Sequence, residues 1–390
     1  MSGIVLSAAV RQNLLSLQDT AALLSTTQNR LATGNKVNSA LDNPTNFFTA
    51  QGLNNRASDI NNLLDSIGNG VQVLQAANTG LTSLQKLVDT AKSIANQVLQ
   101  APTGYSAKST STSSAAVTVD PVTGNLVDGT LIKSGETLAI ASTGGGVATS
   151  ITFGASETLA QLNTALAPNN LSASIDSTTG KLVITTSNDV ASSTIGAITI
   201  GGTAGTLTLG AGTTPTADAA SQAIRTSLVN QYNGIITQIT TTAQDSSFNG
   251  INLLNGDNLK LTFDETAKST LNVSGVTYDA AGLGLSSLTA GTDFLDNSSA
   301  NAALTKLGSA STVLRTEASA LGSNLTIVQL RQDFNKSLIN VLQTGASNLT
   351  LADANEEAAN SQALSTRQSI AVSALSLANQ SQQSVLQLLR

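Results

Sequence analysis

Residues 363–390 read ALSTRQSIAVSALSLANQSQQSVLQLLR and place two apolar stripes on one predicted helix. The first stripe consists of Ala371, Leu375, Ala378, Val385 and Leu389, and the second of Ala363, Ile370, Ala374, Leu377 and Leu388. Steps of three and four residues keep each set on one side of an α-helix, and a sustained seven-residue repeat is typical of coiled coils. Because two stripes indicate two partners, we expect this helix to pack against the first helix of its own chain and against another copy.

The other end of the chain, residues 1–34, repeats this spacing. Its apolar positions are Val10, Leu14, Leu17, Ala21, Leu24 and Leu31, with Gln28 in the one polar turn. Gly34 follows, and a glycine in the left-handed conformation commonly ends a helix. Short helices with two apolar faces are marginal alone, so we expect both chain ends to become ordered when copies of the chain surround them.

Two long helices are predicted between these ends. One begins at Asp42-Asn43-Pro44, an Asx cap followed by proline, and continues to Pro102. Another begins after Asp296-Asn297-Ser298. The predicted core positions are Leu53, Ile60, Leu64, Ile67, Val71 and Leu74 in the former, and Leu314, Leu321, Leu325 and Val328 in the latter. Gln332 and Asn335 interrupt the second seam, and buried polar positions of this kind usually fix the register of a coiled coil.

The composition changes between residues 103 and 218, where Ser, Thr and Gly dominate. Short alternating runs predict strands at 116–119, 137–141, 150–153, 171–175, 182–186, 197–200 and 206–209, with one helix at 157–166. Turn sequences separate them, among them Asp120-Pro-Val-Thr-Gly124 and Asp176-Ser-Thr-Thr-Gly180. A further hairpin is predicted at 259–263 and 270–273, followed by a short run at 276–278.

These patterns predict a mainly α fold of long antiparallel coiled-coil helices from both chain ends, with a β-hairpin and an inserted β-rich outer domain. We expect an inner domain of terminal helices at 1–40 and 351–390. A helical rod domain with the β-hairpin would comprise 41–102 and 219–350. The β-rich outer domain would comprise 103–218.

The residue inventory argues against catalysis. The chain has no Cys and no His, so the commonest acid–base group and thiolate chemistry are missing. Asp353 with Glu357 is expected to be a solvated acidic face rather than a metal site. Asp257, Asp264 and Glu265 cluster near the hairpin, but a calcium loop needs a tighter alternation of ligands. We predict no enzyme activity, no metal and no cofactor. The net charge of −6 argues against nucleic acid, and no apolar run approaches the roughly 20 residues that span a bilayer.

Several stretches resemble bacterial flagellins. They are NRLATG at 29–34, SSFNGINLL at 246–254 and SLANQSQQSVLQLLR at 376–390, and ALDNPTNFF at 40–48 is similar to the alphaproteobacterial type. The resemblance covers roughly residues 1–100 and 220–390. It implies a structural subunit that self-assembles into the helical flagellar filament used for swimming, secreted and extracellular.

The resemblance also implies partners. These are further copies of the chain, the flagellar export apparatus and its chaperone, and the filament cap and hook-associated proteins. Export through the flagellar channel agrees with the N-terminus, MSGIVLSAAVRQNLL, which is a poor secretory signal because no basic residue precedes its apolar patch.

Two features depart from the family pattern. In many members the outer insertion follows the hairpin, whereas here the β-rich block precedes the helix that starts near Ala219. The stretch 84–91, LQKLVDTA, matches the segment that an animal innate-immune receptor recognises in the family. The equivalent residues are Lys86, Leu87, Val88, Asp89 and Gln231, where Val88 replaces a basic residue and Gln231 an acidic one. We expect this chain to escape that receptor.

Two other functions remain open. A hook–filament junction protein would share the terminal helices, although the 246–254 segment and the full C-terminal stretch favour the filament subunit. An adhesive module on a helical stalk is disfavoured, because Tyr105 and Phe153 are the sole aromatic candidates for sugar binding in the β-rich block.

Overall fold

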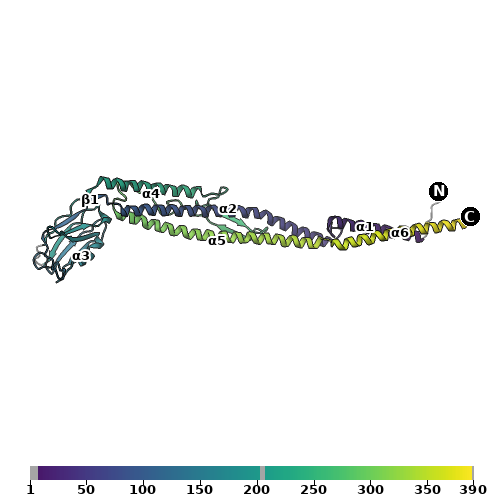
Figure 1. The fold of residues 1–390 in the computed structure, drawn as a ribbon, viewed down its shortest axis with the longest axis horizontal. Helices are drawn as coiled ribbons and strands as arrows, with labels where there is room; N and C mark the ends of the chain where they lie inside the picture. Colours follow the sequence, from purple (N-terminus) through teal and green to yellow (C-terminus); the bar gives the residue numbers. More distant parts are fainter. Residues whose placement is uncertain (1–7, 203–206, 389–390) are drawn as a thin grey trace. The chain divides into compact units, whose positions relative to one another are not determined.

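The computed structural model describes residues 8–202 and 207–388 and is mainly helical (Figure 1). The chain forms two compact units. Unit 1 comprises Met1–Val71, Lys260–Leu271 and Thr326–Arg390, and unit 2 comprises Gln72–Leu259 and Asn272–Leu325. The mainly α fold with a β-rich middle region, predicted from the sequence, is confirmed.

Unit 1 contains the two terminal helices, α1 (Ala8–Thr33) and α6 (Ala354–Leu388), with the adjoining parts of α2 (Pro44–Gln100) and α5 (Asn297–Thr350). Gly34 ends α1 with a φ of 72°, as expected from the sequence. The Asn43 side chain accepts a hydrogen bond from the Asn46 N–H at 3.0 Å, which caps the start of α2. The Asp353 carboxylate does the same for α6, accepting from Asn355 N–H at 2.9 Å. Side-chain caps therefore fix the helix starts on both sides of the junction.

The turn that follows α1 and the turn that follows α5 are joined by backbone hydrogen bonds. Lys36 N–H donates to Thr350 O at 2.7 Å, and Ala352 N–H donates to Gly34 O at 2.9 Å. Both turns, one from each end of the sequence, satisfy backbone groups that the helix ends leave free.

Strands β9 (Leu259–Thr262) and β10 (Thr270–Val273) form the predicted hairpin. In unit 1, a Cβ added to Gly70 would lie 2.3 Å from Leu261 Cδ2, so a larger residue there would displace the hairpin. Because glycine has no Cβ, Gly70 leaves room for the Leu261 side chain. The predicted third run, 276–278, is instead a single bridge between Thr277 and Asn255.

In unit 2, α4 (Ala219–Asp245) begins at an Asp218 cap and lies alongside α2 (Figure 1). The segment after it turns sharply, with positive φ at Asn249 and Gly250. The buried Asn252 amide donates to the carbonyls of Ala243 and Gln244, both at 2.8 Å, and so caps the end of α4. This interaction explains the need for asparagine in the FNGIN stretch.

The β-rich block lies between α2 and α4. Its antiparallel sheets are β2–β6–β5 and β4–β3–β7. The strands are β2 (Thr110–Ala116), β3 (Glu136–Ile140), β4 (Thr149–Thr152), β5 (Leu171–Ile175), β6 (Lys181–Thr186) and β7 (Ile198–Gly202). With α3 (Leu159–Leu166) they enclose one apolar core that includes Leu138, Phe153, Leu162 and Leu182. Helix α3 starts with a capping box formed by Thr158 and Gln161.

Strand β2 corrects the sequence-based prediction, which placed a strand at 116–119. Its inward residues are Ser111 and Ser113, each 1% exposed. Ser111 Oγ donates to Gly210 O at 2.5 Å, and Ser113 Oγ donates to Ala115 O at 2.7 Å. Because hydroxyls replace apolar groups on the inner face, the strand has no apolar alternation to detect. The run at 206–209 was also wrong for its described residues 207–209, where Leu209 makes an isolated bridge.

The block joins the helices at one root. Strands β1 (Tyr105–Ala107) and β8 (Thr216–Ala217) pair, and Asp218 N–H donates to Gly104 O at 3.0 Å. Beside this root, Arg225 is fully buried. Its guanidinium donates to the carbonyls of Pro102 and Phe294 at 2.6 Å and of Val98 and Ala101 at 3.0 Å.

Arg225 thus supplies one positive charge to carbonyls at the end of α2, where helix dipoles favour cations. Burial lowers the pKa of Arg225, and the charge of nearby Asp296 opposes that shift. One side chain therefore binds segments that the sequence separates by more than a hundred residues.

Replacing Arg225 with Met should lower the free energy of unfolding of the chain by about 3 kcal/mol, because several buried carbonyls lose their donor. Urea denaturation of the dilute monomer would measure this. The exposed Arg315 of α5 gives the matched control, and R315M should change stability by less than about 0.5 kcal/mol. Equal stability of R225M and R315M would contradict the assigned role.

Candidate self-assembly surface

The terminal helices α1 and α6 pack along their lengths (Figure 1). The residues of this pair that are withdrawn from solvent recur at steps of three and four. On α1 they are Val10, Asn13, Leu17, Thr20, Leu24, Thr27 and Arg30, and on α6 Glu357, Ser361, Leu364, Gln368, Ala371, Leu375 and Ala378. This spacing is that of a coiled-coil seam.

The predicted stripe of α1 is divided between two faces. Val10, Leu17 and Leu24 lie in the seam, whereas Leu14 and Leu31 are 37% and 43% exposed. Thr20 and Thr27 are the buried residues between them. Of the predicted α6 stripe, Ala371, Leu375 and Ala378 are half-buried; the Val385 side chain and Leu389 lie outside the described residues.

The α1–α6 seam is polar for a coiled coil. Thr20 satisfies its hydroxyl by donating to Ser16 O at 2.7 Å. Arg30 pairs with Glu357 at 3.2 Å, and Glu357 is 8% exposed. Since hydrophobic stabilisation scales with apolar area buried, this pair gains little from its own contact. Several of its large apolar side chains lie outside the seam.

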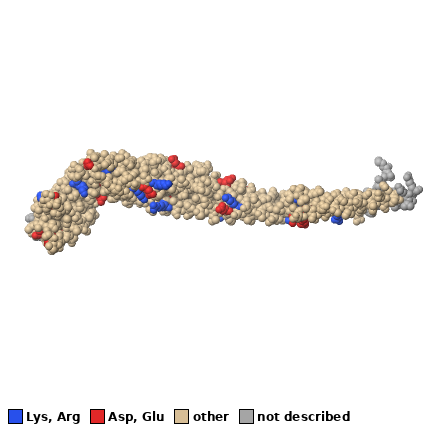
Figure 2. Space-filling model, viewed as in Figure 1, with Lys and Arg blue, Asp and Glu red and all other residues tan. Residues whose placement is uncertain are grey.

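Those groups form exposed faces on both helices. Leu15 and Leu23 of α1 are 62% and 54% exposed, and Ile370 and Leu377 of α6 are 64% and 71% exposed. The predicted second stripe, Ala363, Ile370, Ala374 and Leu377, is exposed throughout; the Leu388 side chain is outside the described part. Figure 2 shows few charged side chains on the visible face of this pair. Repeated apolar exposure of this kind is typical of a surface that binds protein.

The predicted rod core lies inside both units. In unit 1, Ile60, Ile67, Val71 and Val328 are buried, and Leu53 and Leu64 are half-buried beside a cluster of Ala57, Ile60, Ile339 and Leu342. In unit 2, Leu74, Leu314 and Leu321 are buried and Leu325 is half-buried.

Polar groups interrupt this core at defined points. The Asn335 amide, 3% exposed, donates to Phe263 O at 2.9 Å in unit 1. In unit 2 the Gln85 amide donates to Ser311 Oγ at 2.8 Å. Each bond is made in one register of the neighbouring elements, because a shift would leave a buried polar group unpaired.

Helix α5 has a second apolar face that the sequence analysis missed. Ile327, Leu330, Phe334 and Val341 are 45%, 70%, 56% and 66% exposed. Val341 also borders, with Thr344, Gly345 and Asn348, an open hollow of about 410 Å³. The repeat at 327, 334 and 341 is visible in the sequence, but the stronger repeat of the buried face obscured it.

The segment equivalent to the receptor epitope has one buried residue. Val88 is 0% exposed, whereas Lys86, Asp89 and Gln231 are exposed and Leu87 is half-buried. A receptor would therefore meet the residues around position 88 and not Val88 itself. Escape from the receptor stays a prediction.

The acidic clusters have protein partners. Glu265 pairs with Arg56 at 2.7 Å, and the Asp257 carboxylate accepts from Asn252 N–H at 2.8 Å. Hydrogen bonds from the Thr266 hydroxyl and Ser269 N–H hold the pKa of Asp264 below its usual value. Across residues 8–202 and 207–388, no group of three such side chains is arranged to hold a metal ion. Nor is any helix in that part of the chain long and apolar enough to cross a bilayer.

Both helical ends of the chain match models of a known protein family. Residues 5–126 match the bacterial flagellin N-terminal helical region, and residues 304–389 match the bacterial flagellin C-terminal helical region. Together the matches cover more than half of the chain. The chain belongs to the bacterial flagellin family.

Individual flagellins of alphaproteobacteria are similar to it. Flagellin FljM and Flagellin FljK of Caulobacter vibrioides are each 34% identical over 167 residues, which is 42% of this chain. Flagellin A of Rhizobium meliloti is 39% identical over 79 residues, 20% of each chain. The chain aligns with 59% of the length of the two Caulobacter flagellins.

Replacing Phe334 with Asp should leave the monomer as stable as the wild type, because the side chain is exposed, yet should weaken association of copies by at least about tenfold. Light scattering during assembly and urea denaturation of the monomer would measure the two effects. Q329D adds the same charge at an exposed polar position of α5 and should assemble normally. If both variants assemble equally well, the exposed apolar face of α5 is not part of the self-assembly surface.

Proposed function

We propose that this flagellin is a structural subunit of the helical flagellar filament, with no enzymatic role. The observation that carries the proposal is the set of apolar faces on α1, α6 and α5 that the chain leaves exposed. A contact between unlike faces of identical copies generates an open helical array when the rotation between neighbouring copies does not close into a ring. The similarity to named flagellins supports the same function.

We propose the layered arrangement expected from the sequence for the assembled subunit. The terminal helices, 1–40 and 351–390, would form the inner layer, with Val10, Leu14, Leu17, Leu24, Leu31, Ala371, Leu375, Ala378, Val385 and Leu389 in its contacts. Residues 41–102 and 219–350 would surround it, and 103–218 would face solvent. Its further partners would be the flagellar export apparatus, the export chaperone, the filament cap and the hook-associated proteins. After export, the subunit would be extracellular, in the flagellar filament.

Replacing Leu17 or Leu375 with Asp should permit secretion but prevent filament formation, because an unpaired charge in the seam costs several kcal/mol. Electron microscopy of shed filaments and immunoblots of the medium would measure assembly and export. The exposed neighbours Ser16 and Ser376 provide controls, and S16D and S376D should form filaments. Normal filaments from L17D and L375D would count against the seam.

Deleting residues 105–217 and joining Gly104 to Asp218 should leave a chain that still polymerises, since these two residues are already hydrogen bonded at 3.0 Å. Seeded growth measured by electron microscopy would test this. Deleting the β9–β10 hairpin should instead destabilise the monomer, because Leu261 and Phe263 are buried. Failure of the shortened chain to grow would show that the β-rich block takes part in assembly. Growth that stops after one layer of wild-type subunits would favour the hook–filament junction alternative.

A further inference from the structure

The loop between α1 and α2 holds a leucine almost wholly in solvent. Leu41 is 96% exposed. The loop around it is closed by Asp42, whose carboxylate accepts from the N–H groups of Ser39 and Asn38 at 2.8 and 2.9 Å and from the Ser39 hydroxyl at 3.1 Å. These backbone bonds lower the pKa of Asp42. Leu41 is therefore presented on a defined turn.

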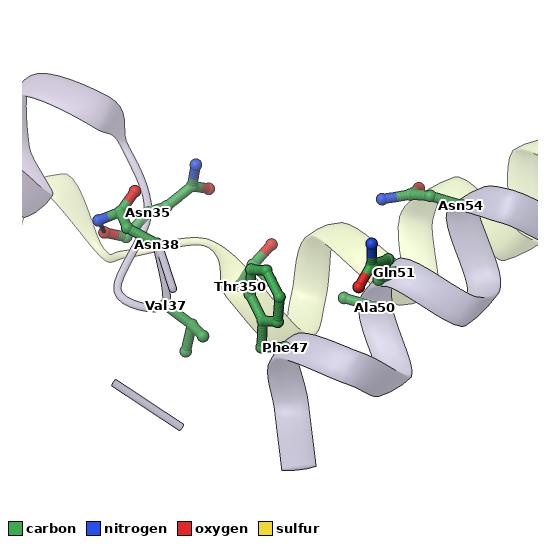
Figure 3. Close-up of a pocket in the computed structure, with 8 residues that line it drawn as sticks. All are labelled: Asn35, Val37, Asn38, Phe47, Ala50, Gln51, Asn54 and Thr350. Atoms are coloured by element: carbon green, nitrogen blue, oxygen red, sulfur yellow. Dashed lines mark hydrogen bonds between the residues drawn. The ribbon is translucent and has the colours of Figure 1, made fainter. Parts of the chain in front are cut away.

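A hollow of about 290 Å³ lies at the same junction (Figure 3). Figure 3 shows Asn35 and Asn38 on one side, Gln51 and Asn54 on the other, and the Phe47 ring between them. Val37 and Ala50 also line it and are 7% and 4% exposed. The site thus combines buried apolar residues with side-chain amides at its rim, of which Asn38, Gln51 and Asn54 are exposed and Asn35 is half-buried.

The lining of this hollow indicates the chemistry of an occupant. Its lining residues, Asn35, Val37, Asn38, Phe47, Ala50, Gln51, Asn54 and Thr350, are all uncharged. An aliphatic side chain matches the base, and the peptide groups of a turn match amides that can both donate and accept. A leucine at the tip of a polar turn has both properties.

The chain's own Leu41 does not fill the hollow, because it is 96% exposed. Leu41, the knob, and the hollow lie at the same junction. Copies packed side by side with a small axial offset would therefore bring the knob of one copy to the hollow of the next. We propose that Leu41 of one copy inserts into the hollow between loop 35–43 and α2 of a second copy. This contact rests on the proposed filament function and adds to it a link between neighbours that is separate from the α1, α6 and α5 faces.

The cysteine-free sequence allows a direct test. A chain carrying L41C and Q51C, which places thiols on the knob and on the rim, should form covalent multimers when assembled filaments are oxidised with a copper–phenanthroline catalyst in air. Dilute monomers should not. L41C combined with N62C, an exposed position farther along α2, should stay monomeric on non-reducing gels. An L41C/N54C chain presents another rim position and is run in parallel.

The second readout is assembly itself. L41S should raise the critical concentration for polymerisation about tenfold, the effect of losing one buried leucine side chain. Val122, 90% exposed in the β-rich block, is the matched control, and V122S should polymerise as the wild type does. The thermal unfolding of dilute L41S should be unchanged, because Leu41 has no packing to lose in the monomer.

The outcomes separate the two proposals. If wild-type chains fail to polymerise on seeds, the filament function itself is overturned. If wild-type filaments form but both rim pairs remain monomeric after oxidation, the knob-and-hollow contact is overturned and the filament function stands. Normal polymerisation of L41S would likewise overturn the contact made by Leu41.

Discussion

Three helices of this flagellin, α1, α5 and α6, carry more apolar surface than their own chain covers. A helix with a single stripe is satisfied by one neighbour, but α1, α5 and α6 present a second set of exposed leucine, isoleucine, valine or phenylalanine side chains. That surplus is tolerable in solution because the side chains are separated by Ser, Thr, Asn and Gln along each face. It becomes a driving force when identical copies are concentrated.

Polar groups decide which contacts form. Apolar stripes of similar residues can slide past one another by a heptad at small cost, whereas a buried amide that loses its partner costs about 1–3 kcal/mol. Asn335 on Phe263 O, Gln85 on Ser311 and Arg30 on Glu357 mark fixed points along the helices. Arg225 acts in the same way at the root of the β-rich block, where one guanidinium binds carbonyls of several segments. Buried polar bonds therefore fix the register of the helices, whereas apolar contacts supply the attraction between them.

Most of the helical architecture follows from the sequence, because apolar spacing and caps such as Asn43-Pro44 and Gly34 are local signals. The buried positions of α2 and α5 were predictable for the same reason. Strand β2 was not, since its inner face uses Ser111 and Ser113 whose hydroxyls bind carbonyls. The α1 seam was predicted only in part, because Thr20 and Thr27 occupy positions where an apolar residue was expected. Arg225 carries no sequence signal, since its partners are backbone atoms distant along the chain. The apolar repeat at 327, 334 and 341 on the exposed face of α5 is present in the sequence, but the repeat of the buried face of the same helix is stronger and hid it.

The hydrogen bond between Asp218 and Gly104 has a consequence for how this lineage can diversify. Since both strands of chain leave and return at neighbouring points, the helical scaffold places little restraint on what is carried there. Any module whose termini lie within a few ångströms of each other would fit the same socket. An exchanged module would give up the contacts that Ser192 and Asp189 of the present block make with Asp296 and Asn301.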